Sequence, residues 1–246
     1  QSFSGFQLNG IERFQAFVAS GASVDFDMSG SNNVAQLILR FAEGSARWQN
    51  VDTTADDIFA IDTVGTADLF VDYVPSQVAG TNDVVNVFVD SAGLDELDIE
   101  AGNILAIETL NITAIDGSTV INDLDSRHTT LNLTGTGDIS LADGNAGTNL
   151  GQDLRDTIRT IDASGLDGDF TVEFKGNDGV GEGVTVTGSS GVNTIIGGSA
   201  DHMITTFDAR DKVVSQGGDD VISTGGERDK ITIQGGGDST LDGGDG

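Results

Sequence analysis

The 246-residue sequence has no cysteine, a single proline, and only 11 lysine and arginine residues against 40 aspartate and glutamate residues. The absence of cysteine excludes disulfides, zinc–thiolate sites and thiol catalysis. No apolar run approaches the ~20 residues that a membrane-spanning helix needs, so we expect no membrane insertion. The shortage of bases argues against nucleic acid as a partner, because lysine and arginine make the phosphate contacts in nucleic-acid-binding proteins.

Glycine and acidic residues are abundant instead. There are 35 glycines, and the formal net charge is −29 with an isoelectric point near 4.1. Glycine permits tight turns, and the acids either face solvent or are partly neutralised by bound cations. The spacing of the acids distinguishes between these two interpretations.

From residue 188 the sequence repeats every nine residues, as GSSGVNTII, GGSADHMIT, TFDARDKVV, SQGGDDVIS, TGGERDKIT and IQGGGDSTL. The sixth position is aspartate in four of these six units, at Asp211, Asp220, Asp229 and Asp238, and the eighth is a β-branched aliphatic residue in five. Glycine allows the turn, and aspartate supplies a hard anionic oxygen. The last three residues of each unit are predicted to form a short strand whose aliphatic side chain points into a coil.

This pattern resembles the calcium-binding nonapeptide G-G-x-G-x-D-x-U-x of RTX proteins, where U is a large apolar residue. The resemblance implies a parallel β-roll in which two units form one turn, so that equivalent loops are two units apart. One row of sixth positions then contains Asn193, Asp211 and Asp229, and the other contains His202, Asp220 and Asp238. Calcium ions are expected between successive loops of each row.

The predicted ligands are the carboxylate, amide and backbone carbonyl oxygens that Ca²⁺ prefers. The pairs Asp211/Asp229 and Asp220/Asp238 are favoured, Asn193/Asp211 comes next, and His202/Asp220 is weakest because imidazole is a poor calcium ligand. The alternative is a set of turns held by side-chain hydrogen bonds alone. Carboxylates stacked about 4.8 Å apart would then repel one another. The full predicted set is Asn193, Asp201, Asp211, Gly217, Asp219, Asp220, Asp229, Gly235 and Asp238.

Upstream segments such as residues 129–135, 169–174 and 183–188 alternate apolar and polar residues, which predicts strands with one buried face. The predicted fold class is all-β, a right-handed parallel β-solenoid that leads into an RTX calcium β-roll. Leu150, Leu154, Ile158 and Ile161 fall at helical spacing after Asn149, so a short helix is predicted near residues 149–161.

Three blocks are predicted along the chain. Residues 1–90 form a first β block, residues 91–187 form a second, related β-solenoid block, and residues 188–246 form the nonapeptide roll. The first two blocks are either parts of one continuous solenoid or separate β domains. The roll is expected to continue beyond the last residue, in a longer protein.

No enzyme is expected in this chain. H-E-x-x-H, G-x-S-x-G and P-loop motifs are absent. The two histidines, His128 and His202, are expected at the surface. Trp48 beside Arg47 is consistent with a sugar platform, but a core position is favoured.

The phrases IETLNIT (residues 107–113) and TIDASGLDGDFTV (residues 160–172) resemble segments of surface-layer proteins and large adhesins of Gram-negative bacteria. In those proteins such β blocks precede RTX calcium repeats. The resemblance implies an extracellular structural protein of the bacterial cell surface that self-associates into a calcium-stabilised two-dimensional lattice. It also implies type I secretion with a signal beyond the last residue, and cell-surface polysaccharide is a further expected partner.

Two alternatives remain open. The first is an RTX adhesin that binds sugars, ice or another cell surface. The second is a β-helix polysaccharide lyase or epimerase, which needs a basic residue beside paired acids in a cleft.

Overall fold

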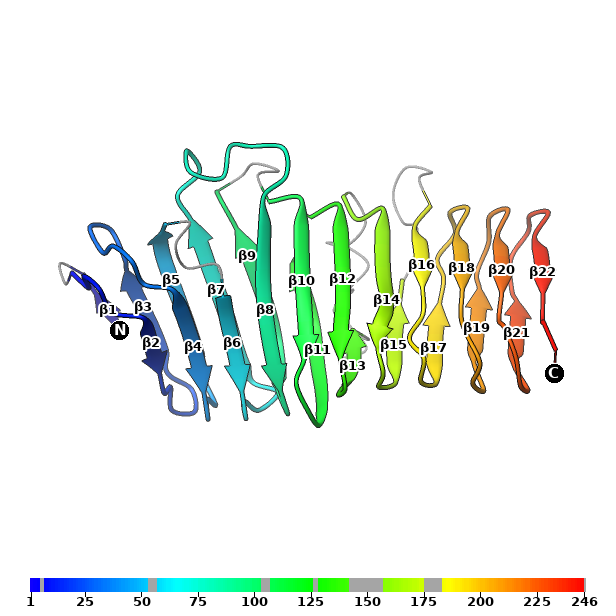
Figure 1. The fold of residues 1–246 in the computed structure, drawn as a ribbon, viewed down its shortest axis with the longest axis horizontal. Helices are drawn as coiled ribbons and strands as arrows, with labels where there is room; N and C mark the ends of the chain where they lie inside the picture. The colour runs from blue at the N-terminus through cyan, green and yellow to red at the C-terminus, as the bar shows by residue number, and fades with distance from the viewer. Residues whose placement is uncertain are drawn as a thin grey trace.

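The computed structural model describes residues 1–4, 7–52, 57–102, 107–125, 128–141, 157–174 and 183–245. Regular structure in these residues consists of β-strands, which form two parallel sheets. The odd-numbered strands make one sheet and the even-numbered strands make the other (Figure 1). The chain therefore passes from one sheet to the other and back in every turn of a coil, which confirms the predicted parallel β-solenoid.

The strands of the odd sheet are β1 (Ser2–Phe3), β3 (Ser23–Asp27), β5 (Ser45–Val51), β7 (Ala67–Tyr73), β9 (Gly93–Glu100), β11 (Ser118–Asp125), β13 (Asp138–Leu141), β15 (Phe170–Glu173), β17 (Asn193–Ile196), β19 (Lys212–Ser215) and β21 (Lys230–Ile233). The strands of the even sheet are β2 (Arg13–Ala16), β4 (Gln36–Arg40), β6 (Asp57–Ile61), β8 (Val84–Asp90), β10 (Thr109–Ala114), β12 (Thr130–Gly135), β14 (Thr160–Leu166), β16 (Thr185–Thr187), β18 (Met203–Thr205), β20 (Val221–Ser223) and β22 (Thr240–Asp242).

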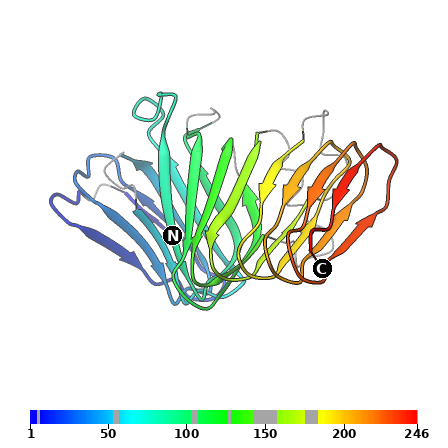
Figure 2. The same cartoon turned by 45° about the vertical axis from the view of Figure 1, so that its right-hand side comes forward.

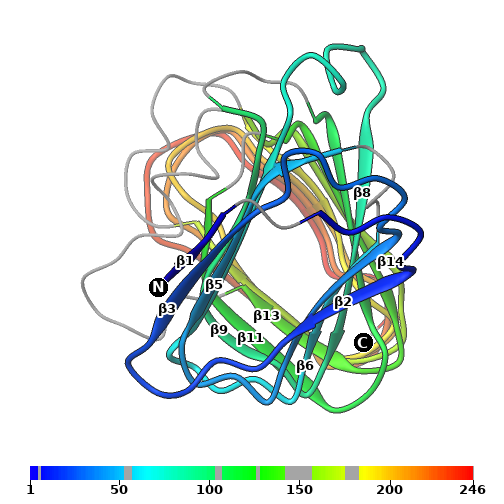
Figure 3. The ribbon, with the colours of Figure 1, turned by 90° about the vertical axis from the view of Figure 1, so that its left-hand side faces the viewer.

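The core lies between the two sheets, which face each other when the coil is seen end-on (Figure 3). Alternate residues of each strand point inward, and the parallel register places them in columns. One column of the even sheet consists of Val85, Leu110, Leu131, Ile161, Val186, Ile204, Ile222 and Leu241. These side chains are buried except Leu241 in the last rung. Aliphatic residues two positions apart in each strand are thus the main source of hydrophobic stabilisation.

The coil runs from the N-terminal rungs to the C-terminal roll (Figure 2). A rung takes more residues at the N-terminal end, where Ser23 pairs with Ser45, than in the roll, where Thr194 pairs with Lys212, so the N-terminal rungs are wider. Aromatic side chains fill this wider interior, and the indole of Trp48 stacks on Phe26 with ring centroids 5.8 Å apart. Phe14 packs edge-on against the same indole at 6.3 Å. Because Trp48 is fully buried, the core interpretation of this residue is confirmed and the sugar-platform alternative is wrong.

Both sheets continue across the boundaries of the predicted blocks. Strand β8 pairs with β10 near residue 90, and β16 pairs with β18 near residue 187. The blocks 1–90, 91–187 and 188–246 therefore lie in the same two sheets, while their division as domains stays a prediction. Among the described residues, none forms a helix that could cross a lipid bilayer.

The helix predicted near residues 149–161 is not confirmed. Residues 149–156 lie outside the described part of the chain, whereas Thr157 is in a turn and Thr160 begins strand β14. Ile161 pairs with Leu131 on one side and Val186 on the other, so the extended conformation already buries it in the inward column. For Ile158 and Ile161, the helical spacing was misleading.

We predict that Leu110→Ala, in the middle of the inward column, lowers the free energy of unfolding by about 2–5 kcal/mol, because it leaves a cavity between the sheets. Leu110 is fully buried. The control is Thr109→Ala on the same strand, which points outward and should change stability by no more than about 0.5 kcal/mol. Urea denaturation of both variants measures the difference, and equal losses would contradict the assignment of the two faces.

Candidate functional site

The C-terminal roll brings the nonapeptide loops together along two opposite edges. Loops 188–192, 206–211 and 224–229 follow even strands and form what we name the even edge. Loops 197–202, 216–220 and 234–239 follow odd strands and form the odd edge. Equivalent residues in successive loops are 18 residues apart in most of the roll, as the resemblance implied.

On the even edge, Asn193, Asp211 and Asp229 stack in the predicted row. The backbone N–H of Asn193 donates to Asp211 Oδ1 at 2.7 Å, and that of Asp211 donates to Asp229 Oδ1 at 2.9 Å. The Asn193 side-chain amide also donates to Asp211 Oδ1 at 3.0 Å. Each sixth-position side chain therefore reaches the backbone of the preceding rung, and Asn193 and Asp211 are buried.

On the odd edge, His202 and Asp220 form an equivalent buried pair. The backbone N–H of His202 donates to Asp220 Oδ1 at 2.8 Å. The next partner of Asp220 is Ser239, whose Oγ accepts from the Asp220 backbone N–H at 3.3 Å. The predicted pair Asp220/Asp238 is therefore wrong in register.

Asp238 belongs to a second, exposed row on the odd edge. The backbone N–H of Asp219 donates to Asp201 Oδ1, and that of Asp238 donates to Asp219 Oδ1, both at 2.7 Å. The predicted ligands Asp201, Asp219 and Asp238 thus lie one above another, and this row faces solvent.

A longer loop causes this shift of register. The loop at residues 234–239 is one residue longer than the loop at residues 216–220, so the last step is 19 residues. Leu241 rather than Thr240 consequently pairs with Ile222. A strict nine-residue count holds only as far as strand β21.

Glycines allow the loops of the odd edge to stack closely. Gly218 has a φ of 86°, and a Cβ there would collide with the carbonyl oxygen of Ala200 one rung below. A Cβ on Gly235 would collide with the carbonyl oxygen of Gln216 and lie 2.5 Å from the Cα of Gly217. The predicted positions Gly217 and Gly235 therefore lie against each other, and only residues without a side chain fit this contact.

Three buried carboxylate oxygens in the roll have no hydrogen-bond partner. They are the Oδ2 atoms of Asp211, Asp220 and Asp229, each on a carboxylate whose Oδ1 already accepts a backbone N–H. Asp211 and Asp220 are about 2% and 1% exposed. The Arg47–Asp72 pair is the ion pair found among the described residues, and it lies far from the roll in the sequence. A buried carboxylate oxygen without a partner is unfavourable, so these three atoms are the positions in the roll where a bound cation would stabilise the fold most.

Hydroxyl groups next to the loops were missed by the sequence reasoning. Thr206, Ser215 and Thr224 each occupy the first position of a nonapeptide, and their hydroxyl oxygens are buried without a hydrogen-bond partner. Thr224 and Asp229 line the same open hollow of about 400 Å³. Neutral hydroxyl oxygens are hard donors that fit calcium as ligands. The signal in the sequence was a column of hydroxyl residues where the RTX pattern has glycine.

Both histidines are buried, so the prediction of surface histidines is wrong. The His202 ring stacks on Phe174 at 5.5 Å, its Nδ1 lies 3.2 Å from the backbone nitrogen of Val184, and its Nε2 lies 3.2 Å from that of Gly198. Backbone amide groups therefore surround the imidazole of His202. The Nδ1 of His128 lies 2.8 Å from the carbonyl oxygen of Ile107 and forms a hydrogen bond with it.

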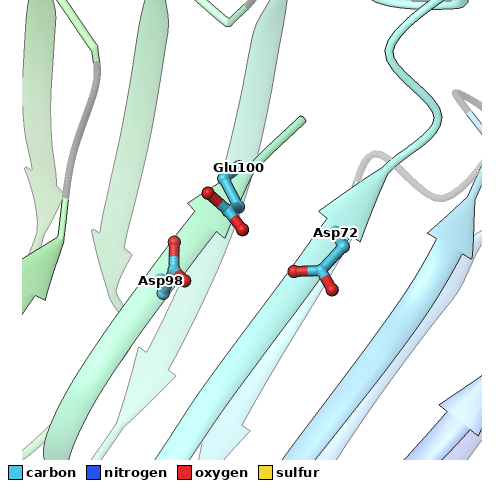
Figure 4. A group of neighbouring side chains, drawn as sticks. All are labelled: Asp72, Asp98 and Glu100. Carbon is cyan, nitrogen blue, oxygen red and sulfur yellow. The ribbon is translucent and has the colours of Figure 1, made fainter. Parts of the chain in front are cut away.

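A second acidic group, which the sequence did not predict, lies on the outer face of the odd sheet. Carboxylate oxygens of Asp72, Asp98 and Glu100 lie within 4.8 Å of one another on strands β7 and β9 (Figure 4). Arg47 donates from Nη1 to both carboxylate oxygens of Asp72, at 3.1 and 3.0 Å. Burial raises the pKa of Asp72 above its ordinary value, and the Arg47 guanidinium opposes this rise. The guanidinium of Arg47 therefore already balances part of the negative charge of these three carboxylates.

Comparison with protein families, curated proteins and solved structures finds no match for this chain.

We predict that Asp220→Asn makes the protein more stable than the unchanged chain without calcium and less stable than the unchanged chain with calcium. In chelator the variant should be about 1–3 kcal/mol more stable than the unchanged chain, because it removes a buried charge and keeps the Oδ1 acceptor for His202. In millimolar calcium the unchanged chain should be the more stable. Asp62→Asn, at an exposed position with a φ of 51° that asparagine tolerates, is the control. Thermal unfolding in chelator and in calcium measures both differences. If the Asp220→Asn variant is less stable than the unchanged chain in chelator, the interpretation of Asp220 as a buried, unpaired charge is wrong.

Proposed function

We propose that this chain is a calcium-stabilised structural module of a bacterial surface layer. The observation that carries the proposal is the set of buried, partnerless Oδ2 atoms on Asp211, Asp220 and Asp229. A divalent cation beside each would supply the missing partner and neutralise carboxylates that recur at the rung spacing of about 4.8 Å.

The donor set suits calcium better than a transition metal. The roll offers carboxylates and hydroxyls as oxygen donors, with Thr224 and Asp229 lining one hollow, and cysteine is absent from the chain. Hard cations take such oxygens, whereas zinc and copper favour imidazole and thiolate. His202 is the imidazole in the roll, and its two nitrogens lie against backbone amides. Asp211 and Asp229 with Thr206 and Thr224 would hold ions on the even edge, and Asp220 with Ser215 would hold one on the odd edge.

Calcium would then act as a switch for folding at the cell surface. Extracellular calcium modules bind at about 10⁻⁴–10⁻³ M. Below that range the roll carries buried charges without partners, and above it each ion ties two successive loops together. Because neighbouring loops share hydrogen bonds, occupation of one site favours the next.

The surface-layer assignment rests on the resemblance of residues 107–113 and 160–172 to such proteins and on the order of the β blocks before the calcium repeats. A long coil with different outer faces suits a protein that contacts copies of itself in a plane (Figure 1). The proposed location is the extracellular face of the cell, after type I secretion. The proposed partners are other copies of the chain and cell-surface polysaccharide, and no catalytic activity is proposed.

We expect calcium to produce a cooperative gain of β signal in chelator-treated protein. The test is a titration followed by far-ultraviolet circular dichroism and by light scattering on the same samples. The transition should lie below a few millimolar, and ordered assemblies should appear at the same calcium concentration. Magnesium is the control, because it retains its water and requires stricter octahedral geometry.

The outcomes separate the parts of the proposal. Folding without assembly would refute the lattice function and favour the adhesin alternative. No response of either signal to calcium would refute the calcium roll itself. A calcium response that persists in the Asp211→Asn, Asp220→Asn, Asp229→Asn triple variant would refute the assignment of these ligands.

One observation favours the polysaccharide lyase or epimerase alternative. Arg47 forms an ion pair with Asp72, whose carboxylate lies beside those of Asp98 and Glu100, so a basic residue and paired acids, two of the three features that this class needs, are present. Incubation with uronate polymers tests it through the ultraviolet absorbance of unsaturated products. A signal that disappears in Arg47→Ala would replace the structural proposal with an enzymatic one.

A further inference from the structure

The outer faces of the two sheets differ in charge. Carboxylates dominate the outward positions of the odd sheet, including Asp25, Asp27, Asp68, Asp72, Glu96, Asp98, Glu100 and Asp123. The outward positions of β10, β12, β14 and β16 are nearly uncharged, and they are Thr109, Asn111, Thr113, Thr130, Asn132, Thr134, Thr160, Asp162, Ser164, Thr185 and Thr187. In a chain with a net charge of −29, Asp162 is thus the one charged residue among these outward positions.

Asparagine amides form a ladder across this face. The parallel register aligns Asn86, Asn111 and Asn132 on successive strands β8, β10 and β12. The side-chain nitrogen of Asn111 donates to the Asn86 oxygen at 2.9 Å, and that of Asn132 donates to the Asn111 oxygen at 2.9 Å. Each amide is therefore held in one orientation while a second N–H and a second lone pair remain on its exposed side. All three side chains are half-buried.

A hollow of about 460 Å³ lies over the ladder. Its lining includes the three asparagines together with Thr113, Thr134 and Asp162. A bulge in β14 opens it, because the register between β12 and β14 shifts after the pair Asn132 and Asp162. Gly165 keeps it open, since a Cβ there would lie 2.9 Å from Thr134 Cγ2. Figure 1 looks onto this sheet, and the described chain leaves β8, β10, β12 and β14 uncovered.

Stacked aromatic rings adjoin the hollow. Phe59 and Phe88 lie on β6 and β8 with ring centroids 4.7 Å apart and planes 15° apart. Phe88 pairs in register with Thr113, so the rings continue the same row of outward positions. Aromatic faces accept the C–H faces of sugar rings. Amides donate hydrogen bonds to hydroxyls and accept them, and carboxylates accept them.

We propose that this hollow on the even sheet binds an uncharged polysaccharide chain that lies across the rungs. The strands repeat the same polar groups at about 4.8 Å, which suits a polymer with regularly repeated hydroxyl groups. The ladder is already ordered, so binding loses little side-chain entropy there. This proposal does not depend on the calcium sites.

The polar and nearly uncharged lining of the hollow disfavours polyanions, cationic partners and apolar protein surfaces as ligands. A polyanion would be repelled by Asp162, and the lining of the hollow contains no cationic side chain to attract it. A cationic partner would find far more carboxylates on the odd sheet. An apolar protein surface would leave the amides and Asp162 without hydrogen-bond partners, which costs free energy. A hydroxyl-rich, uncharged ligand satisfies all of these groups.

Affinity electrophoresis tests the proposal with the full chain in calcium buffer. The probes are a glucan, a mannan and a galactan, with polygalacturonate as the charged comparison. At least one should retard the protein, and Asn111→Val with Asn132→Val should weaken that binding by about tenfold or more. Thr187→Val is the matched control, since it makes the same kind of change on the same face outside the hollow. Valine suits an exposed strand position, so the variants should fold.

A second measurement uses the unchanged chain and does not depend on how the variants fold. Side-chain amide resonances of Asn86, Asn111 and Asn132 should shift when oligosaccharides of the retained polymer are added. Retardation by none of the three polymers, equal retardation of the double variant, or preferential binding of polygalacturonate would overturn the proposal. Loss of self-association in the double variant without any sugar binding would also overturn it and would identify a second copy as the occupant.

Discussion

Every feature of this protein depends on parallel backbone pairing that must stay in register from one rung to the next. Each strand donates and accepts hydrogen bonds with the strands before and after it in the same sheet, so each loop must return the chain to the same phase. Where the phase holds, inward aliphatic residues form continuous columns such as the one from Val85 to Ile222. A shift by one residue would turn the whole column outward.

The same constraint creates the electrostatic problem of the C-terminal roll. Loops in register place side chain above side chain, so an aspartate that recurs in each unit becomes a stack of carboxylates. Asp211 and Asp220 meet part of this cost by accepting a backbone N–H through Oδ1. Their second oxygens remain buried without a partner, which is why a cation is the simplest completion of the site.

Register also gives the two outer faces their separate characters. On the even sheet it aligns three asparagines into a hydrogen-bonded ladder, and on the odd sheet it gathers Asp72, Asp98 and Glu100 beside Arg47. The acidic face repels polyanions, whereas the neutral face offers ordered hydrogen-bonding groups. Different partners can therefore use opposite sides of one coil.

The alternation of apolar and polar residues in the sequence predicted the all-β class, and the resemblance of its nonapeptides to RTX repeats implied the parallel coil and the row of Asn193, Asp211 and Asp229. A strict nine-residue period makes these features readable, because the aliphatic position of every unit must be buried in the same way. Only the tertiary structure decided what depends on loops of unequal length. In the structure Asp238 lies beside Asp219 rather than Asp220, and His202 is buried against Phe174. Ile161 lies in a strand, where the sequence had predicted a helix. The tertiary structure also aligned Asn86, Asn111 and Asn132, which are 25 and 21 residues apart. No fixed period in the sequence marks such residues, because loops absorb the difference in length and hydrogen bonding between strands restores the register.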